Sequence, residues 1–172
     1  MAWLDERGRN GSVDEVPLPA SVPGRLWLCG KHFIGPDPDE AVARTAADVV
    51  VCLNERYELA PRYPEYVAWL DANGGPGGLA EWFPVPDLHA PPIEQVAPLV
   101  GELVARIRAG HSVLVHCGAG IGRAGTIAAA ILMRMGMPLD DALALLHTSR
   151  PGAGPQADVQ TALLLALAAE PD

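Results

Sequence analysis

A strand, a glycine-rich turn and a helix follow one another in the segment VLVHCGAGIGRAGT, from Val113 to Thr126. The run Ser112–His116 is continuous, apolar and rich in valine, which is typical of a strand buried on both faces of a sheet. Glycines follow this run, and a helical pattern then extends from about Arg123 to Met135. Because a doubly buried strand needs helices on both faces of its sheet, this unit predicts an α/β fold.

Similar strand patterns occur at Arg25–Leu28, Asp48–Leu53 and Trp82–Val85, and helical patterns separate them. The alternation predicts one α/β domain around a single sheet, covering residues 23–172. A chain of 172 residues is long enough to bury one such core. Residues 1–22 are polar and contain glycine and proline, so we expect them to form a flexible arm.

The charge and the cysteines limit the possible partners and location. A formal net charge of −9 argues against nucleic-acid binding, which needs a basic surface, and against attachment to anionic membranes. The amino end MAWLDERGRNGSVDE is charged and lacks the apolar stretch of a secretory signal. The three cysteines are odd in number and far apart, which predicts neither a disulfide framework nor a zinc site. We therefore expect a reducing cytoplasm as the location.

The turn after Ser112–His116 has the composition of an anion-binding loop. Its glycines at 118, 120 and 122 permit the backbone torsions that point successive N–H groups inward. The helix that follows adds the free N–H groups of its amino end. Arg123 can fold back and grip two oxygens of a bound dianion. The segment predicts a phosphate site that needs no metal and no cofactor.

Cys117 stands at the base of this loop. The positive field of the N–H groups favours its thiolate, which is the nucleophilic form of cysteine. The alternative is a buried, inert cysteine, the usual fate of this residue type. The strand, the glycines and the arginine together favour a nucleophile.

The sequence HCGAGIGR resembles the signature loop of the protein tyrosine and dual-specificity phosphatase superfamily, in which His-Cys precedes five residues and an arginine. The short chain fits a compact dual-specificity member, and the resemblance implies an α/β fold with a single central mixed sheet flanked by helices. It also implies that Cys117 attacks phosphorus in line. His116 would tune the thiolate, or it is a core histidine that ends a strand. The implied phosphate-binding residues are Gly118, Ala119, Gly120, Ile121, Gly122 and Arg123.

A poor leaving group needs a proton from an acid. Asp87 follows a short strand and a proline in the sequence WFPVPDLH, and the acid loop of the family carries the same Pro-Asp pair. The resemblance implies that Asp87 protonates the leaving oxygen and later accepts a proton from water. Pro-Asp also forms ordinary turns, so a structural role stays open. We interpret the neighbouring His89 as a solvated loop residue.

Two more segments resemble parts of the family that surround the phosphate. In the sequence RPGAGPQADVQ, a glutamine would orient the hydrolytic water. Gln160 matches this role better because apolar residues follow it, and Gln156 is its rival. Glu55 and Arg56 follow a predicted strand, where they would brace Arg123, touch substrate or simply be solvated.

Ala124 departs from many relatives, which carry serine or threonine directly after the arginine. The missing hydroxyl would stabilise the departing thiolate, and phosphatases of regenerating liver share this alanine. We therefore expect slow breakdown of a phosphoenzyme, since Thr126 lies too far along the chain to substitute. Cys52 lies near the place where some relatives carry a redox partner for the nucleophile, and the alternative is a buried strand cysteine.

These features predict a cysteine-dependent phosphatase that forms a phosphocysteine intermediate. Gly118 and Ile121 in the loop are uncharged, which disfavours inositol lipids and favours phosphotyrosine in proteins. A shallow pocket would also admit phosphoserine and phosphothreonine. The alternatives are hydrolysis of small-molecule or lipid phosphate esters, and a slow, substrate-trapping phosphate-binding module. Sulfur transfer by a rhodanese-like domain fits the length and glycines of the loop less well.

Overall fold

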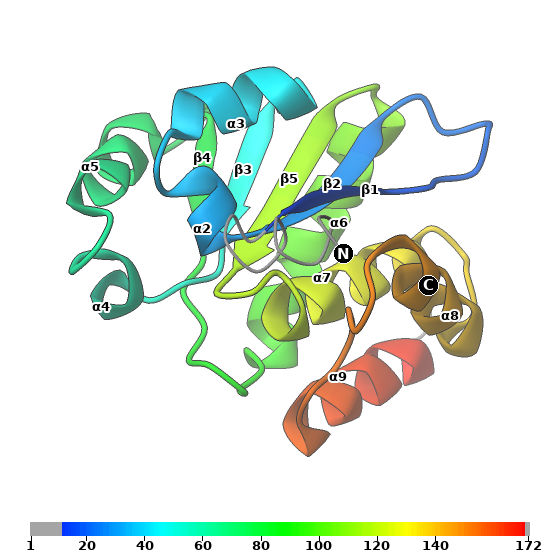
Figure 1. Cartoon of the computed structure of the whole chain (residues 1–172). Helices are drawn as coiled ribbons and strands as arrows, with labels where there is room; N and C mark the ends of the chain where they lie inside the picture. The colour runs from blue at the N-terminus through cyan, green and yellow to red at the C-terminus, as the bar shows by residue number, and fades with distance from the viewer. Residues whose placement is uncertain (1–11, 171–172) are drawn as a thin grey trace.

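A mixed five-stranded sheet covered by helices on both faces forms the fold (Figure 1). The computed structural model describes residues 12–170. The strands are β1 (Val13–Val16), β2 (Arg25–Gly30), β3 (Val49–Cys52), β4 (Ala80–Trp82) and β5 (Ser112–Cys117). The helices are α2 (Lys31–Ile34), α3 (Pro38–Thr45), α4 (Arg56–Leu59), α5 (Pro64–Asn73), α6 (Ile93–Arg108), α7 (Gly122–Arg134), α8 (Leu139–Ser149) and α9 (Asp158–Ala169). The expected α/β fold with a single central mixed sheet is confirmed.

The strand order β1-β2-β5-β3-β4 puts β5 in the centre of the sheet. Strands β2, β5, β3 and β4 run parallel, and β1 is antiparallel to β2. All six residues of β5 are buried, as its continuous apolar pattern predicts. Because parallel strands end at the same edge, the segments after β2, β3 and β5 meet at the carboxyl edge of the sheet, where α/β folds bind ligands (Figure 1).

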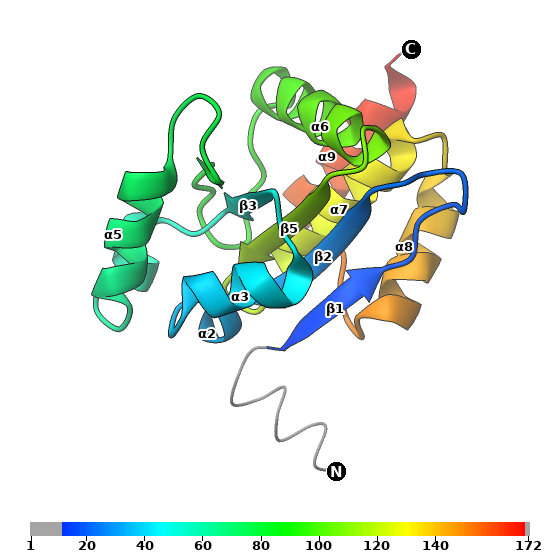
Figure 2. The same ribbon diagram turned by 90° about the horizontal axis from the view of Figure 1, so that it is seen from above.

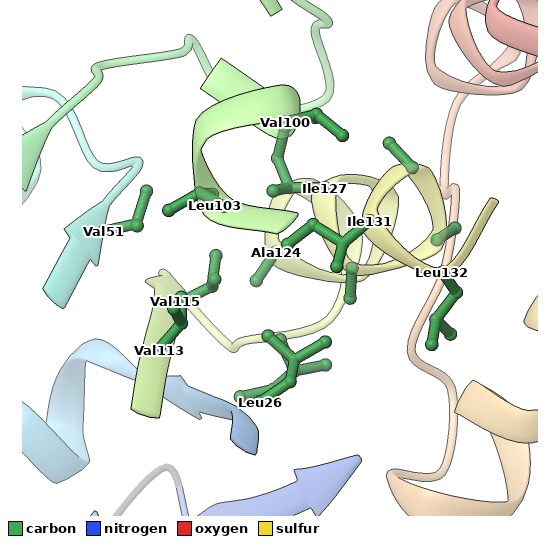
Figure 3. Close-up of a cluster of buried hydrophobic side chains, with 14 of the residues drawn as sticks. Leu26, Val51, Val100, Leu103, Val113, Val115, Ala124, Ile127, Ile131 and Leu132 are labelled. Carbon is green, nitrogen blue, oxygen red and sulfur yellow. The ribbon is translucent and has the colours of Figure 1, made fainter. Parts of the chain in front are cut away.

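The helices form two layers, with α6 to α9 on one face of the sheet and α2, α3 and α5 on the other (Figure 2). Alternate side chains of β5 point to opposite faces. Val113 and Val115 join a core with Ile127 and Ile131 of α7 (Figure 3), whereas Leu114 belongs to the cluster on the other face. The helix α7 is buried along most of its length, so the loop before it is held between a central strand and a central helix.

Two expectations about the edges of the sheet are wrong. Residues 13–16 of the expected flexible arm form β1, whose backbone pairs with β2 and whose Val16 is 1% exposed. Pairing with an existing edge and burial of one valine stabilise a segment whose own pattern is mostly polar. The first eleven residues of that arm lie outside the described residues. At the other edge, the strand expected at Trp82–Val85 is the three-residue β4, which begins earlier and ends at Trp82.

Candidate active site

The loop between β5 and α7 is held at the carboxyl edge of the sheet by contacts to its backbone. Gly120 has a φ of +72°, and a Cβ at this position would collide with the carbonyl of Cys29, so only glycine fits. The backbone N–H of Lys31 donates to the carbonyl of Gly118 at 2.9 Å. The neighbouring strand β2 and helix α2 therefore shape the loop directly.

Arg123 folds back over the start of this loop. Its Nη2 lies 3.5 Å from the place that a Cβ on Gly118 would occupy. Cys117, the last residue of β5, is 3% exposed and lies at the base of the loop. The sequence prediction that one loop brings this thiol and this guanidinium together agrees with the geometry.

The guanidinium of Arg123 is clamped by four acceptor oxygens, and the longest of these contacts runs from Nη1 to the Leu53 carbonyl at 3.4 Å. Nη1 donates to the Val85 carbonyl at 2.7 Å and to Oε2 of Glu58 at 2.8 Å, and Nη2 donates to Oε1 of Glu58 at 2.8 Å. Its Nε is buried and has no hydrogen-bond partner within residues 12–170. A buried N–H group normally has a partner, so this donor fits an oxygen of an anion held in the loop.

Glu58 is the bracing residue that sequence reasoning missed. Burial opposes its ionisation, but hydrogen bonds from Arg123 and from the backbone N–H of Glu55 outweigh burial and lower the pKa of Glu58. Asn54 donates a further bond to its Oε1 at 3.1 Å. The spacing of Glu55 and Glu58 is that of a capping box, which α4 forms, and this was the available sequence signal.

Arg56 does not brace Arg123, although it lies next to the clamp in sequence. It forms an ion pair with Asp71 at 2.9 Å and stacks over the ring of Trp82 at 4.7 Å. The side chain of Glu55 accepts the backbone N–H of Glu58 in the capping box. Glu55 therefore supports the clamp only through the helix cap.

His116 is a fully buried core residue with a satisfied side chain. Its Nε2 shares a hydrogen bond with the Tyr66 hydroxyl at 2.6 Å. Burial lowers the pKa of His116 to about 4, so the imidazole is neutral at pH 7. Since neighbouring side chains in a strand point to opposite faces, any influence of His116 on Cys117 passes through the backbone.

Cys52 and Cys117 lie on opposite faces of the sheet. Cys52 is in register with His116 and packs in the cluster that contains Tyr66, whereas Cys117 belongs to the cluster beneath α7. Both thiols are free, and burial raises the pKa of Cys52 to about 12. Cys52 is thus an inert strand cysteine, and a disulfide between the two would require rearrangement of the sheet.

Asp87 lies at the rim of the site on the loop after β4. Its Oδ1 is 3.5 Å from Nη2 of Arg123, and the side chain is 66% exposed. The same oxygen accepts the backbone N–H of Leu88 at 3.0 Å, and Leu88 has a φ of +62°. Leu88 thus has a strained backbone directly after Asp87. Such residues cluster in the segments of active sites that change conformation, so the strain suits a loop that moves.

The two candidate glutamines occupy different positions. Gln160 is 1% exposed, accepts the backbone N–H of Gln156 at 2.7 Å and donates to the His89 carbonyl at 3.2 Å. Its amide therefore links the loop that carries Asp87 and His89 to the loop before α9. Gln156 is exposed, and its side-chain amide lies so close to Gly122 that a Cβ there would collide with it. Gln156 therefore lies against the glycine loop at Gly122, whereas Gln160 contacts the backbone of His89.

Arg150 is a second buried arginine that the sequence analysis did not select. It is 3% exposed and donates to the carbonyls of Gly120 at 2.8 Å and Ala119 at 2.7 Å. It also forms an ion pair with Asp14 of β1 at 2.7 Å. By holding two carbonyls on the outer side of the loop, Arg150 favours the backbone orientation that turns N–H groups inward.

We expect Arg150→Met to weaken both folding and anion binding. The variant leaves the buried Gly120 carbonyl, the part-buried Ala119 carbonyl and the mostly buried Asp14 carboxylate without this partner, which costs about 2–4 kcal/mol of unfolding free energy. Urea unfolding measures this change, and vanadate titration under native conditions measures the loss at the loop. Arg44→Met, at an exposed position on α3, is the control. An unfolding free energy equal to that of the unchanged protein would contradict the bracing role.

Neither a metal site nor a membrane span is found in the part of the chain that the structure describes. Among residues 12–170, no three side chains of histidine, cysteine, aspartate or glutamate are grouped so that they could hold a metal ion. No helix within the same residues combines the length and apolarity needed to cross a bilayer.

Comparison with known proteins gives consistent matches. The family model PTP-SAK, described as a Swiss Army Knife protein, DSP-PTPase phosphatase domain, matches residues 29–163. Dual specificity phosphatase 28 of Homo sapiens is 32% identical over 156 residues, which cover 87% of this chain and 78% of the relative.

Two solved structures show the extent of the structural likeness. Tk-PTP in its active form superposes with a TM-score of 0.65 at 31% identity and covers 88% of this chain and 98% of its own. Kinase associated phosphatase, with its catalytic-site cysteine replaced by serine, superposes with a TM-score of 0.75 at 20% identity and covers 93% of this chain and 97% of its own. The second likeness bears on the fold alone.

Proposed function

The chain belongs to the dual-specificity and protein tyrosine phosphatase family, and from this premise we propose that it hydrolyses phosphotyrosine in proteins through a phosphocysteine intermediate. The observation that carries the proposal is the guanidinium of Arg123 over the loop, with its Nη groups clamped and its buried Nε left for an anion. A preorganised donor beside a thiol suits in-line attack on phosphorus.

In the first step, the thiolate of Cys117 attacks phosphorus, the S–P bond forms and the bond from phosphorus to the ester oxygen breaks. Asp87 gives its proton to that oxygen, which leaves as an alcohol or phenol. In the second step, water attacks phosphorus, the S–P bond breaks and Asp87 takes the proton of the water. Arg123 and the amides of residues 118–122 stabilise the charge on the transferring group. We assign Gln156 or Gln160 to the orientation of that water, with Gln156 favoured by its place beside Gly122.

Slow release of phosphate is part of the proposal. Ala124 is completely buried and offers no hydroxyl to the thiolate that leaves in the second step. The hydroxyl of Thr126 donates to the carbonyl of Gly122 at 2.7 Å, so it is engaged within its own helix. The thiolate chemistry also suits a reducing compartment, and we propose the cytoplasm.

A substrate panel under metal-free conditions tests the proposed substrate class. With EDTA present, we expect vanadate-sensitive turnover of phosphotyrosine peptides, and slower turnover of phosphoserine and phosphothreonine peptides, whose shorter side chains reach the thiol less well. Faster turnover of soluble or lipid-borne phosphate esters than of every peptide would replace the protein-phosphatase proposal by hydrolysis of small-molecule or lipid esters.

Asp87→Asn tests the general acid. Removing the proton donor matters most when the leaving oxygen is basic, so we expect a loss of roughly 10²-fold in kcat for an alkyl phosphate and less than about tenfold for a nitrophenyl phosphate. Steady-state assays on the two esters measure the difference. His89→Asn, two residues along the same loop, is the control. Equal losses on both esters would reject Asp87 as the acid.

A further inference from the structure

The only lysine of the chain lies beside the phosphate loop. The backbone N–H of Lys31 donates to the carbonyl of Gly118, and its Nζ donates to the Glu58 carbonyl at 3.2 Å. Gly118 begins the loop, and Glu58 clamps Arg123. Lys31 is therefore tied to both parts, because its backbone contacts the loop at Gly118 and its ammonium contacts the backbone of the residue that clamps Arg123.

Two more polar side chains lie near Lys31, and they are His32 on α2 and Arg62 in the segment after α4. Nδ1 of His32 shares a hydrogen bond with the Tyr63 hydroxyl at 2.6 Å, and Arg62 lies over the ring of the same tyrosine at 5.6 Å. Burial first, and then the charges of Arg62 and Lys31, lower the pKa of His32. Both cations are thus close enough to act electrostatically on His32.

Lys31 and Arg62 differ from most of the described arginines because no carboxylate in residues 12–170 forms an ion pair with them. Within the described residues, neither Lys31 nor Arg62 forms an ion pair, whereas Arg25, Arg56 and Arg123 do. The chain as a whole has a net charge of −9. Lys31, whose backbone contacts the anion-binding loop, and Arg62, which lies over Tyr63, are thus two cations without a paired carboxylate in the described part of an acidic chain, and they would attract a second negative group.

We propose that Lys31, His32 and Arg62 form a second anion site, which binds a carboxylate or phosphate group carried close to the phosphorylated residue of a peptide. The proposal rests on the proposed phosphatase function and names its substrate class. The ammonium and the guanidinium donate charge-assisted hydrogen bonds, and the imidazole adds a neutral polar contact. The substrate is then an acidic or doubly phosphorylated peptide segment.

The surroundings of the loop favour a peptide over a lipid surface. Tyr57 on α4 is 69% exposed, and Leu88 on the acid loop is 51% exposed. Tyr57 is next to Glu58 in sequence and Leu88 is next to Asp87, so each of these large exposed apolar residues is the neighbour of a residue that contacts Arg123. Such groups suit the side chains that flank a phosphorylated residue, whereas an acidic protein is repelled by an anionic membrane.

Matched phosphotyrosine peptides test the second anion site. One peptide carries alanines around the phosphotyrosine, a second carries glutamates, and a third carries an added phosphoserine. At low salt with EDTA, we expect kcat/KM of the unchanged protein to be about tenfold higher for each acidic peptide than for the alanine peptide. We expect Lys31→Met and Arg62→Gln each to reduce this ratio about threefold. The ratio should also shrink in high salt.

Arg108→Gln is the control, because it removes one exposed charge at the end of α6 and should keep the ratio of the unchanged protein. Equal kcat/KM for all three peptides would overturn the second site and leave the proposed function standing. No turnover of any phosphopeptide would overturn both. A ratio that falls as much in Arg108→Gln as in Lys31→Met would assign the preference to overall charge and overturn the site. Faster turnover of a soluble inositol bisphosphate than of the acidic peptides would overturn the peptide assignment.

Discussion

Cys117→Ser is expected to abolish turnover of every phosphate ester, with a loss on the order of 10⁴-fold or more in kcat. A serine hydroxyl has a slightly shorter reach than the thiol and is almost entirely protonated at pH 7, so the loop has no anionic nucleophile to stabilise. Arg123 and the loop amides are unchanged, and binding of a phosphopeptide should therefore persist. Metal-free hydrolysis of an aryl phosphate measures the first effect, and calorimetric titration with a phosphotyrosine peptide measures the second.

Cys52→Ser is the matched control for this prediction. It makes the same chemical change on the opposite face of the sheet, so it should keep turnover while it lowers stability through a buried hydroxyl. Turnover that survives Cys117→Ser would remove the central proposal. If the unchanged protein binds phosphopeptide but shows no turnover, the chain acts as a phosphate-binding module, and Ala124 would be the first residue to exchange for serine.

Arg123→Lys is expected to lower kcat/KM by roughly 10²- to 10³-fold, although the charge is kept. The guanidinium is planar, donates to Glu58 with both Nη atoms and keeps a buried Nε without a partner in residues 12–170, and one ammonium cannot reproduce this arrangement. Vanadate affinity should fall together with kcat/KM, because the lost contact belongs to the bound oxyanion. Steady-state kinetics and vanadate titration measure the two effects.

Arg25→Lys provides the comparison for this substitution. Arg25 also makes a two-point contact, to Glu15, but it does so on the exposed surface of β2, where an ion pair contributes little. We expect no measurable change in kcat/KM or Tm for this control. If Arg123→Lys also left kcat/KM unchanged, the planar two-point geometry of the guanidinium would have no part in catalysis. The contacts with Glu58 would then contribute to stability alone.

The local unit around Cys117 could be derived from the sequence because its parts are adjacent in the chain. A valine-rich run predicts a buried strand, glycines predict the turn and apolar spacing predicts the helix, and β5, the loop and α7 follow in that order. Asp87 was also accessible, since a proline and an aspartate after a strand pattern indicate a loop at the sheet edge. These inferences depend on short-range chemistry, which a single sequence displays directly.

The sequence by itself thus determined the α/β class, and it was enough to select Cys117 as the proposed nucleophile and Arg123 as the proposed phosphate ligand. Only the tertiary structure decided which side chains support them. Glu58 reaches Arg123 across 65 residues, and Asp14 reaches Arg150 across 136 residues. A carboxylate three residues from Glu55 looks like a helix cap, and an aspartate near the amino end looks solvated. The pairing of these two carboxylates with Arg123 and Arg150 depends on the order of the strands in the sheet. Segments far apart in the chain must pack together before either carboxylate lies next to its arginine.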